Sequence, residues 1–291
     1  LTDGVFQRWI QDDPQLHGIG AVIFDEFHER RLAVDVALAR CLDLQDGPRP
    51  DLRVVVMSAT LETAGLADFL APAVTLEAGG RTYPVEVFYR PEKASTHDRR
   101  GGPPREIAIW ERMVGVCREA MSMSDAGNIL MFLPGTHEIR KTIELLEQGS
   151  TTRGWEVFPL YSTLPPVAQE AAIRPGDKPK IIVATNVAET SLTIEGVRTV
   201  IDSGQARIAS FEPRRGINTL HVKKISRAAA EQRTGRAGRT APGRAFRLWS
   251  EADHARRAEF ESPEVRRVDL AEAVLMLKSA GVHEIRDFRW F

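Results

Sequence analysis

Two adjacent carboxylates, Asp25 and Glu26, are the first residues in the sequence that could carry out chemistry. They follow the apolar run at residues 21–24 (AVIF), which has the composition of a buried strand. Open α/β sheets bind their ligands at the carboxyl ends of such strands. There Asp25 could hold a Mg²⁺ ion that carries nucleotide phosphates, and Glu26 could orient and deprotonate an attacking water. Taken alone the pair is a weak signal, because an aspartate at this position also caps a following helix.

A second set of residues has arginine at every third position. It is the segment Gln232–Arg239 (QRTGRAGR), which contains Arg233, Arg236 and two glycines. Planar guanidinium groups bind phosphate oxygens in pairs and keep their charge, and glycine lets a backbone come close to a ligand. Two glycines within four residues make a poor surface helix, so phosphate binding is favoured over a plain solvated face.

Small hydroxyl side chains follow two further apolar runs. Ser58 and Thr60 come after residues 53–57 (RVVVM), and the segment at residues 185–193 (TNVAETSLT) comes after residues 180–184 (KIIVA). The hydroxyls of Ser58 and Thr60 could relay hydrogen bonds between domains, whereas a hydroxyl-rich turn such as residues 185–193 is of the kind that contacts sugars and phosphates. Helix capping and turn formation are the alternatives, and for Ser58 and Thr60 alone capping is the preferred interpretation.

The sequence contains no Gly-x4-Gly-Lys-Ser/Thr loop for nucleotide phosphates. The nearest segment is 135–142 (GTHEIRKT), where Arg140 stands in place of the second glycine, and it is better interpreted as the start of a helix. The chain begins at Leu1, in the middle of a pattern. We therefore expect a piece of a longer protein, and we expect no efficient ATP hydrolysis by this piece alone.

The elements that must position these residues are strands and helices in alternation. Apolar runs of strand length separated by amphipathic stretches, such as the one at 33–44, indicate a parallel sheet that is covered on both faces. The segment 90–105 is rich in proline, glycine and charge, and it predicts a linker between two α/β domains. The predicted strands lie at residues 21–24, 53–57, 128–133, 180–184 and 197–201.

Two further segments have patterns of their own. Residues 207–223 read as two strands around the turn at 212–216 (EPRRG), which predicts a β-hairpin because proline comes early in the turn and glycine late. From Ser262 onward a helical pattern begins.

Composition limits the classes of protein that fit. The 291 residues are 43% hydrophobic with a formal net charge of -1, enough for two globular domains. Residues 1–80 hold 13 acidic and 6 basic residues, whereas residues 201–257 hold 5 acidic and 13 basic ones. The basic half indicates a polyanion partner, with a solvated charged face as the alternative. Two cysteines and no apolar run near about 20 residues fit a cytoplasmic protein without a membrane partner.

In this order, the segments resemble the motif series of the DEAH/RHA class of superfamily-2 helicases. The spelling at residues 25–30 (DEFHER) is similar to a bacterial branch that has Phe where relatives have Ala. The resemblance implies two RecA-like parallel-sheet domains, the first incomplete at 1–89 and the second at 106–260. A linker at 90–105 separates them, and a helical winged-helix domain starts at 261–291. It also implies ATP-dependent RNA helicase activity, with ATP and Mg²⁺ (Mg2+) bound and RNA as the partner, as a single strand or a tailed duplex, with DNA as an alternative.

The same resemblance implies a role for each matching residue. Asp25 would bind the metal, Glu26 would be the base, and Gln232, Arg236 and Arg239 would complete catalysis as the water-orienting glutamine and two arginine fingers. His28, Ser58 and Thr60 would couple hydrolysis to movement, and Ser191 and Glu195 would bind nucleotide. Nucleic acid would be contacted by Thr2, Asp3, Gly4, Gly135, Thr185 and Thr190. The hairpin resembles one that lies at the point of strand separation.

Two other functions remain open at this point. One is a nucleic-acid-stimulated ATPase that remodels complexes, or acts on DNA, without unwinding a duplex. The other is a nucleic-acid-binding module that is not an enzyme. The sequence departs from the family pattern at Arg31, where serine is usual, and at Thr234, which replaces a common alanine.

Overall fold

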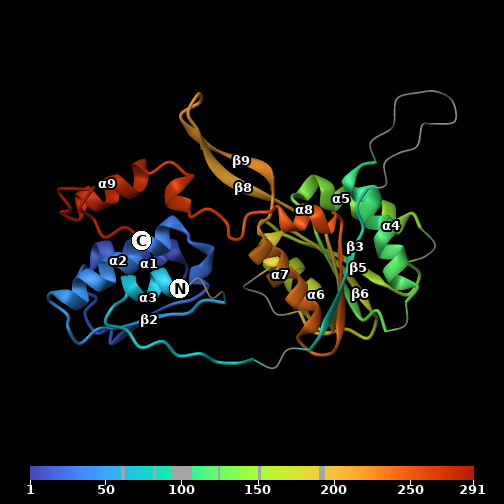
Figure 1. Cartoon of the computed structure of the whole chain (residues 1–291), viewed down its shortest axis with the longest axis horizontal. Helices are drawn as coiled ribbons and strands as arrows, with labels where there is room; N and C mark the ends of the chain where they lie inside the picture. Colours follow the sequence, from blue (N-terminus) through green and yellow to red (C-terminus); the bar gives the residue numbers. More distant parts are fainter. Residues whose placement is uncertain (60–62, 81–82, 93–106, 124, 150–151, 190–193) are drawn as a thin grey trace. The chain divides into compact units, whose positions relative to one another are not determined.

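The computed structural model describes residues 1–59, 63–80, 83–92, 107–123, 125–149, 152–189 and 194–291. The chain folds into two compact units, which are considered one at a time (Figure 1). Unit 1 comprises residues 1–78, 209–220 and 262–291, and unit 2 comprises residues 79–208 and 221–261.

Unit 2 is built on a six-stranded sheet in which every neighbouring pair of strands is parallel. The strand order is β3-β10-β7-β4-β6-β5, so the strands at the centre of the sheet are the apolar runs that the sequence predicted. The strand bounds are β3 (Val85–Tyr89), β4 (Asn128–Phe132), β5 (Glu156–Leu160), β6 (Lys180–Ala184), β7 (Val197–Asp202) and β10 (Gly243–Arg247).

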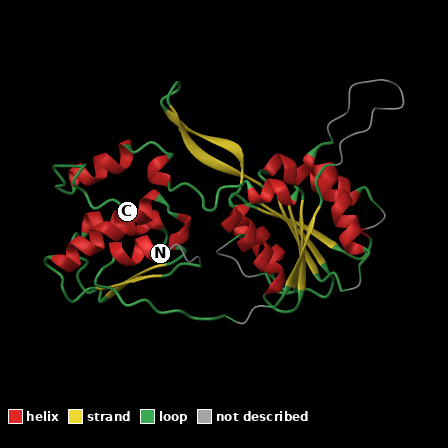
Figure 2. Ribbon diagram, in the orientation of Figure 1, coloured by secondary structure: helices red, strands yellow, loops and turns green. Residues whose placement is uncertain are grey.

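Helices cover both faces of this sheet (Figure 2). On one face Ile129 and Met131 of β4 pack with α4 (Ile109–Met121) and α5 (Thr136–Glu147). On the other face Leu130 and Phe132 join a core that includes Ala172 of α6 (Pro166–Ile173). Because alternate residues of a strand point to opposite faces, a strand covered on both sides must be apolar throughout.

Unit 1 contains a short parallel pair, β1 (Ala21–Phe24) and β2 (Arg53–Val56), in register from Ala21 opposite Arg53. Helix α2 (Leu32–Asp46) has two buried sides. One packs on β1 together with α1 (Asp3–Asp12) and α3 (Thr63–Phe69), and the other packs on α9 (Ala271–Ser279). The C-terminal segment from Ser262 is therefore part of unit 1.

The predicted hairpin is present as β8 (Gln205–Glu212) and β9 (Ile217–Lys224). Its turn is closed by hydrogen bonds from the amides of Arg215 and Gly216 to the Glu212 carbonyl. Gly216 has a φ of 67°, a backbone conformation that glycine adopts without steric cost. The helices around the arginine segment are α7 (Arg227–Gly235), η4 (Arg236–Gly238) and α8 (Glu251–Ala255).

The predicted α/β class, the predicted strands and the predicted hairpin are confirmed. Strands β3, β5 and β10 were not predicted, because each carries charged residues or proline and none reads as an apolar run. The expected domain boundary at residue 89 falls at the end of β3, yet β3 pairs with β10 in unit 2. The linker expected at 90–105 lies outside the described residues from position 93 onward. Among the described residues, no helix combines the length and the apolar character that crossing a membrane requires.

Candidate functional site

The acidic segment, residues 25–30, forms a tight loop at the carboxyl ends of β1 and β2, which is called the acidic loop below. The Met57 amide donates to the Phe24 carbonyl at 2.8 Å, and the Phe27 amide donates to the Met57 carbonyl at 3.0 Å. Glu26 and Arg30 bracket the 3-10 turn η1 (Phe27–Glu29), and both have left-handed backbones, with φ values of 51° and 48°. Non-glycine residues in this region are held there by their surroundings and concentrate at functional sites.

Asp25 belongs to this loop and caps no long helix. One of its carboxylate oxygens, Oδ1, accepts a hydrogen bond from the Glu26 amide at 2.8 Å, and the side chain is exposed. The N-cap of α2 is Arg31, well past the point where a capping aspartate was the alternative. The capping interpretation of Asp25 is therefore wrong for α2.

His28 lies between Glu26 and the loop that follows β2. Its Nδ1 accepts a hydrogen bond from the Ala59 amide at 3.3 Å, so in the neutral ring the proton is on Nε2. Nε2 is buried and lies 3.4 Å from Oε2 of Glu26, without the angles of a hydrogen bond. The two atoms are therefore close but not hydrogen-bonded, because a hydrogen bond weakens steeply when its angle is poor. Ser58 is exposed beside it, and Thr60 lies outside the described residues.

A magnesium ion is compatible with the acidic loop. Asp25 and Glu26 are neighbouring carboxylates at the open end of a parallel strand pair, and both reach solvent. Among the described residues there is no cluster of three or more His, Cys, Asp or Glu that could hold a metal by itself. Mg²⁺ usually keeps several waters and is bound by one or two carboxylates together with substrate phosphates, so the residues present fit that ion.

The arginine segment divides into buried and exposed members. Arg233 is fully buried: its guanidinium donates to Glu189 at 2.8 Å and to Asp202 at 2.9 Å, and it lies 4.8 Å from the Phe132 ring centre. Burial alone would lower the pKa of Arg233, but Asp202 and Glu189 outweigh it and raise the pKa. A permanently charged, doubly paired guanidinium of this kind anchors α7 to the ends of β7 and η3 (Asn186–Ala188).

Arg236 and Arg239 differ in exposure. Arg236 is buried and donates from Nε to the Glu189 carbonyl at 2.8 Å, so Glu189 holds Arg233 with its carboxylate and Arg236 with its backbone. Arg239 is exposed, and Gln232 is half-buried on α7. These three predicted catalytic residues lie in unit 2, whereas Asp25, Glu26 and His28 lie in unit 1.

The predicted nucleic-acid residues lie at element ends. Gly135 is the N-cap of α5, and a Cβ atom there would meet Nε of Arg207 at 2.7 Å, so the end of this flexible side chain would have to move for a larger residue. Thr185 precedes η3. Thr2, Asp3 and Gly4 begin α1, and Asp3 accepts from Arg31 at 3.0 Å. Thr190 and Ser191 lie outside the described residues.

Glu195 lies at the side of the sheet where the parallel strands begin. It precedes β7, its carbonyl accepts from Asn128 at the start of β4, and its side chain is exposed beside α6. Glu195 is therefore at the opposite edge of the sheet from Asp202, which ends β7 and pairs with Arg233.

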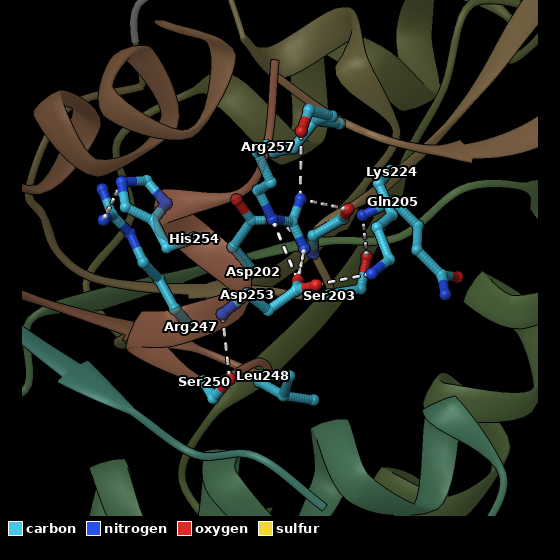
Figure 3. A network of polar contacts seen from close by, with 12 residues as sticks. Asp202, Ser203, Gln205, Lys224, Arg247, Leu248, Ser250, Asp253, His254 and Arg257 are labelled. Atoms are coloured by element: carbon cyan, nitrogen blue, oxygen red, sulfur yellow. Dashed lines mark hydrogen bonds and ion pairs between the residues drawn. The ribbon is translucent and has the colours of Figure 1, made fainter. Parts of the chain in front are cut away.

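A polar network at the base of the hairpin was not predicted (Figure 3). Arg257 donates to the carbonyls of Gly204 and Ile225, at 2.9 and 3.0 Å, and its guanidinium lies 4.1 Å from the Trp249 ring centre. Asp253 pairs with Arg257 at 3.0 Å. Since Gly204 and Ile225 flank β8 and β9, Arg257 joins the two ends of the hairpin. Charge was the only sequence signal for this residue.

Comparisons with known proteins agree with the motif series. Residues 111–241 match the helicase conserved C-terminal domain family. The whole chain is 40% identical to part of the ATP-dependent RNA helicase HrpB of Escherichia coli, and 99% of it is 38% identical to part of the ATP-dependent RNA helicase HrpA of the same organism. A crystal structure of the E. coli DEAH/RHA helicase HrpB matches 99% of the chain with a TM-score of 0.88 and 39% identity, over 35% of that structure's chain. The chain thus spans about a third or less of these relatives, 34% of HrpB and 22% of HrpA.

Proposed function

We propose that this chain is part of an ATP-dependent RNA helicase core of the DEAH/RHA class, which couples ATP hydrolysis to movement along RNA or to unwinding. The observation that carries the proposal is the acidic loop. Two carboxylates lie at the end of β1, Glu26 has a left-handed backbone, and its side chain lies 3.4 Å from a buried histidine side chain. Relatives that are 40% and 38% identical are named ATP-dependent RNA helicases.

In the proposed reaction, the exposed carboxylate of Asp25 would hold Mg²⁺. When bound, this ion neutralises charge on the phosphates. Glu26 orients the attacking water and accepts its proton. His28 limits the space open to the Glu26 side chain, because its ring lies 3.4 Å from that carboxylate and is fixed by the Ala59 amide. Through that amide, His28 also connects the acidic loop to the residue after Ser58, which supports a coupling role.

Positive charge for the transition state would come from the arginine segment. Phosphoryl transfer spreads negative charge over the γ-phosphate oxygens, and an arginine placed there raises the rate by roughly 10³–10⁵ in related enzymes. Arg239 is exposed, and Arg236 is buried with its guanidinium bonded to the Glu189 carbonyl. We assign Arg236 and Arg239 to the phosphates, Gln232 to the attacking water, and Ser191 and Glu195 to the nucleotide.

RNA would be held mainly through its phosphates and sugars. The proposed contacts are backbone groups and hydroxyls at element ends, namely Thr2, Asp3, Gly4, Gly135, Thr185 and Thr190. Such contacts position a strand without reading its sequence. A cytoplasmic location is part of the same proposal, and the two cysteines, Cys41 and Cys117, are buried free thiols.

Replacement of the base tests the proposal. In a protein that carries this chain together with a phosphate-binding loop, such as E. coli HrpB with its aligned segment exchanged for this chain, Glu26→Gln should reduce ATP turnover at least about 100-fold. ATP and RNA binding should change little, because the amide keeps the shape of the side chain. Turnover is measured by phosphate release, and binding by fluorescence anisotropy.

The matched control is Glu29→Gln. Glu29 lies in the same turn but is paired with Arg31, so its loss should leave turnover within about threefold. If Glu26→Gln hydrolyses ATP at the parent rate, Glu26 is not the base. Strand displacement from tailed RNA and DNA duplexes then separates a helicase from an ATPase that remodels complexes without unwinding.

A further inference from the structure

The C-terminal segment of unit 1 contacts both the acidic loop and the outer part of the hairpin, residues 209–220, which is called the hairpin tip below. It does so through the short 3-10 turn η5 (Glu264–Arg266) and the residue that follows it, Arg267. All these residues lie in unit 1, because the hairpin residues 209–220 and the segment 262–291 are both part of it. The acidic loop and the hairpin tip are thus joined by two side chains from one turn.

Glu264 holds the end of the acidic loop. Its amide donates to the Arg30 carbonyl at 3.0 Å, and its carboxylate Oε2 accepts from the Leu32 amide at 2.9 Å. Arg30 is one of the two left-handed residues that bracket η1. Its side chain is fixed as well, by two bonds of 3.1 Å to the buried Asp35. A strained residue persists only where its surroundings over-determine it, and Glu264 supplies the backbone contact at Arg30.

Arg267 holds the tip of the hairpin. Its Nη1 donates to the Ala209 carbonyl at 2.6 Å, and its own carbonyl accepts from the Phe211 amide at 2.6 Å, both on β8. Two residues further along, the Asp269 amide donates to the Asn218 side chain on β9 at 2.7 Å. Both strands of the hairpin are therefore bonded to the same short segment.

Glu264 and Arg267 are also bonded to each other. Nη2 of Arg267 donates to Oε1 of Glu264 at 3.3 Å, while Oε2 of Glu264 is bound to Leu32. The pair is partly buried, with side chains about a fifth to a quarter exposed. A shift of the hairpin tip must therefore move Arg267, and through Glu264 it must strain or release the backbone of Arg30 and Leu32.

We propose that Glu264 and Arg267 are positioning residues that couple the hairpin tip to the loop bearing Glu26 and His28. The inference rests on the proposed function only for what the loop catalyses. The coupling itself is a property of this chain. Ile217 and Leu220 at the hairpin tip are exposed, so a molecule that binds there can displace the tip. Through Arg267 and Glu264 this displacement would reach the acidic loop.

The test is hydrogen exchange of the 291-residue chain, followed by mass spectrometry on peptides that cover residues 26–35 and 207–220. Arg267→Ala should speed exchange about tenfold in both peptides, since it removes charged hydrogen bonds at one end and frees Glu264 at the other. Arg266→Ala is the control, because Arg266 is an exposed arginine in the same turn. It should leave both peptides unchanged.

Two further variants keep the test decisive. Asn218→Ala changes only the tip, and it should also speed exchange at residues 26–35. Glu264→Gln keeps an oxygen for the Leu32 amide and should retain protection there, whereas Glu264→Ala should lose it. If Arg267→Ala and Asn218→Ala alter only residues 207–220, the coupling does not exist. Should Arg267→Ala loosen the whole chain, Asn218→Ala decides the question by the same criterion.

An enzymatic measurement then separates this inference from the proposed function. In the HrpB protein that carries this chain, Arg267→Ala should lower the RNA stimulation of ATP turnover, which is the ratio of turnover with RNA to turnover without it, at least about threefold. Unaltered stimulation would overturn the coupling. If the protein without the Arg267→Ala change hydrolyses no ATP with or without RNA, the proposed function fails. The hydrogen-exchange data still decide the coupling in that case.

Discussion

Single residues of one motif have different roles. Arg233, Arg236 and Arg239 have the same spacing and chemistry in the sequence, yet Arg233 is wholly engaged with Glu189 and Asp202. Breaking such a buried pair by removing one partner leaves a charge without compensation, which costs roughly 3–5 kcal/mol. An arginine in this environment is part of the fold of unit 2 and has no free face for a phosphate.

His254 gives a prediction about pH. Burial lowers the pKa of His254 from its usual value of 6.5, Arg247 lowers it further, and Glu231 opposes them. Nη1 of Arg247 lies 3.3 Å from Nε2 of His254, which suits a neutral ring that accepts there. As pH falls below about 6.5, the unfolded chain takes up a proton that the folded chain refuses, so stability declines down to the lowered folded pKa.

The measurement is urea unfolding of the wild type and of His254→Gln at about pH 7.5 and about pH 5.5, on either side of the unfolded pKa. The wild type should lose more stability between the two conditions than the variant, which has no titrating ring at this position. Equal losses would show that His254 does not respond to pH. The fluorescence of Trp249, whose ring stacks on His254, provides a local probe.

At the scale of elements, one of the two glycines of the arginine segment, Gly238, serves packing within the protein. A Cβ atom at Gly238 would meet the Tyr83 carbonyl oxygen at 2.5 Å and the Val85 side chain at 2.8 Å. The Tyr83 amide also donates to the Gly238 carbonyl at 2.8 Å, so η4 lies directly against the start of β3. The sequence suggested that these glycines bring the backbone close to a ligand, but at Gly238 the close neighbour is the chain itself.

Gly235 and Gly238 therefore make a matched pair for mutation. Gly238→Ala should destabilise unit 2 by about 1–3 kcal/mol, since carbonyl and strand must move. Gly235 ends α7 with ordinary helical angles, and a methyl group added there would meet nothing within 4 Å. Gly235→Ala should therefore be neutral or stabilising by up to about 1 kcal/mol. Equal unfolding midpoints for the two variants would contradict this packing.

The whole molecule carries its charge unevenly, with an acidic N-terminal stretch and a basic stretch at residues 201–257. If RNA binds through phosphates, its affinity must fall steeply with salt. Neutralising about four phosphates of a single strand predicts roughly a 50-fold loss between about 50 and 200 mM salt. Fluorescence anisotropy with labelled RNAs of different sequence measures this, and the slopes should agree between sequences. A flat salt response would exclude the basic stretch as the binding surface.

The sequence by itself determined the parts that depend on local order along the chain. Strands buried on both faces are recognisable as apolar runs, so β4, β6 and β7 could be predicted. The runs at β1 and β2 are apolar as well, although alternate residues of both strands are exposed, and the hairpin turn at 212–216 is set by its own proline and glycine. The acidic pair and the arginine segment were found in the same way, by residue type and spacing.

Only the tertiary structure decided which of these residues are buried and which are exposed. Strand β3 is recognisable only through its pairing with β10, a strand far along the chain, because edge strands tolerate charge and proline. Arg233 became structural, and the Glu264–Arg267 turn joined the acidic loop to the hairpin, through partners that are distant in the sequence. Burial and hydrogen bonding between distant segments are set by packing, and residue type and spacing carry no record of them.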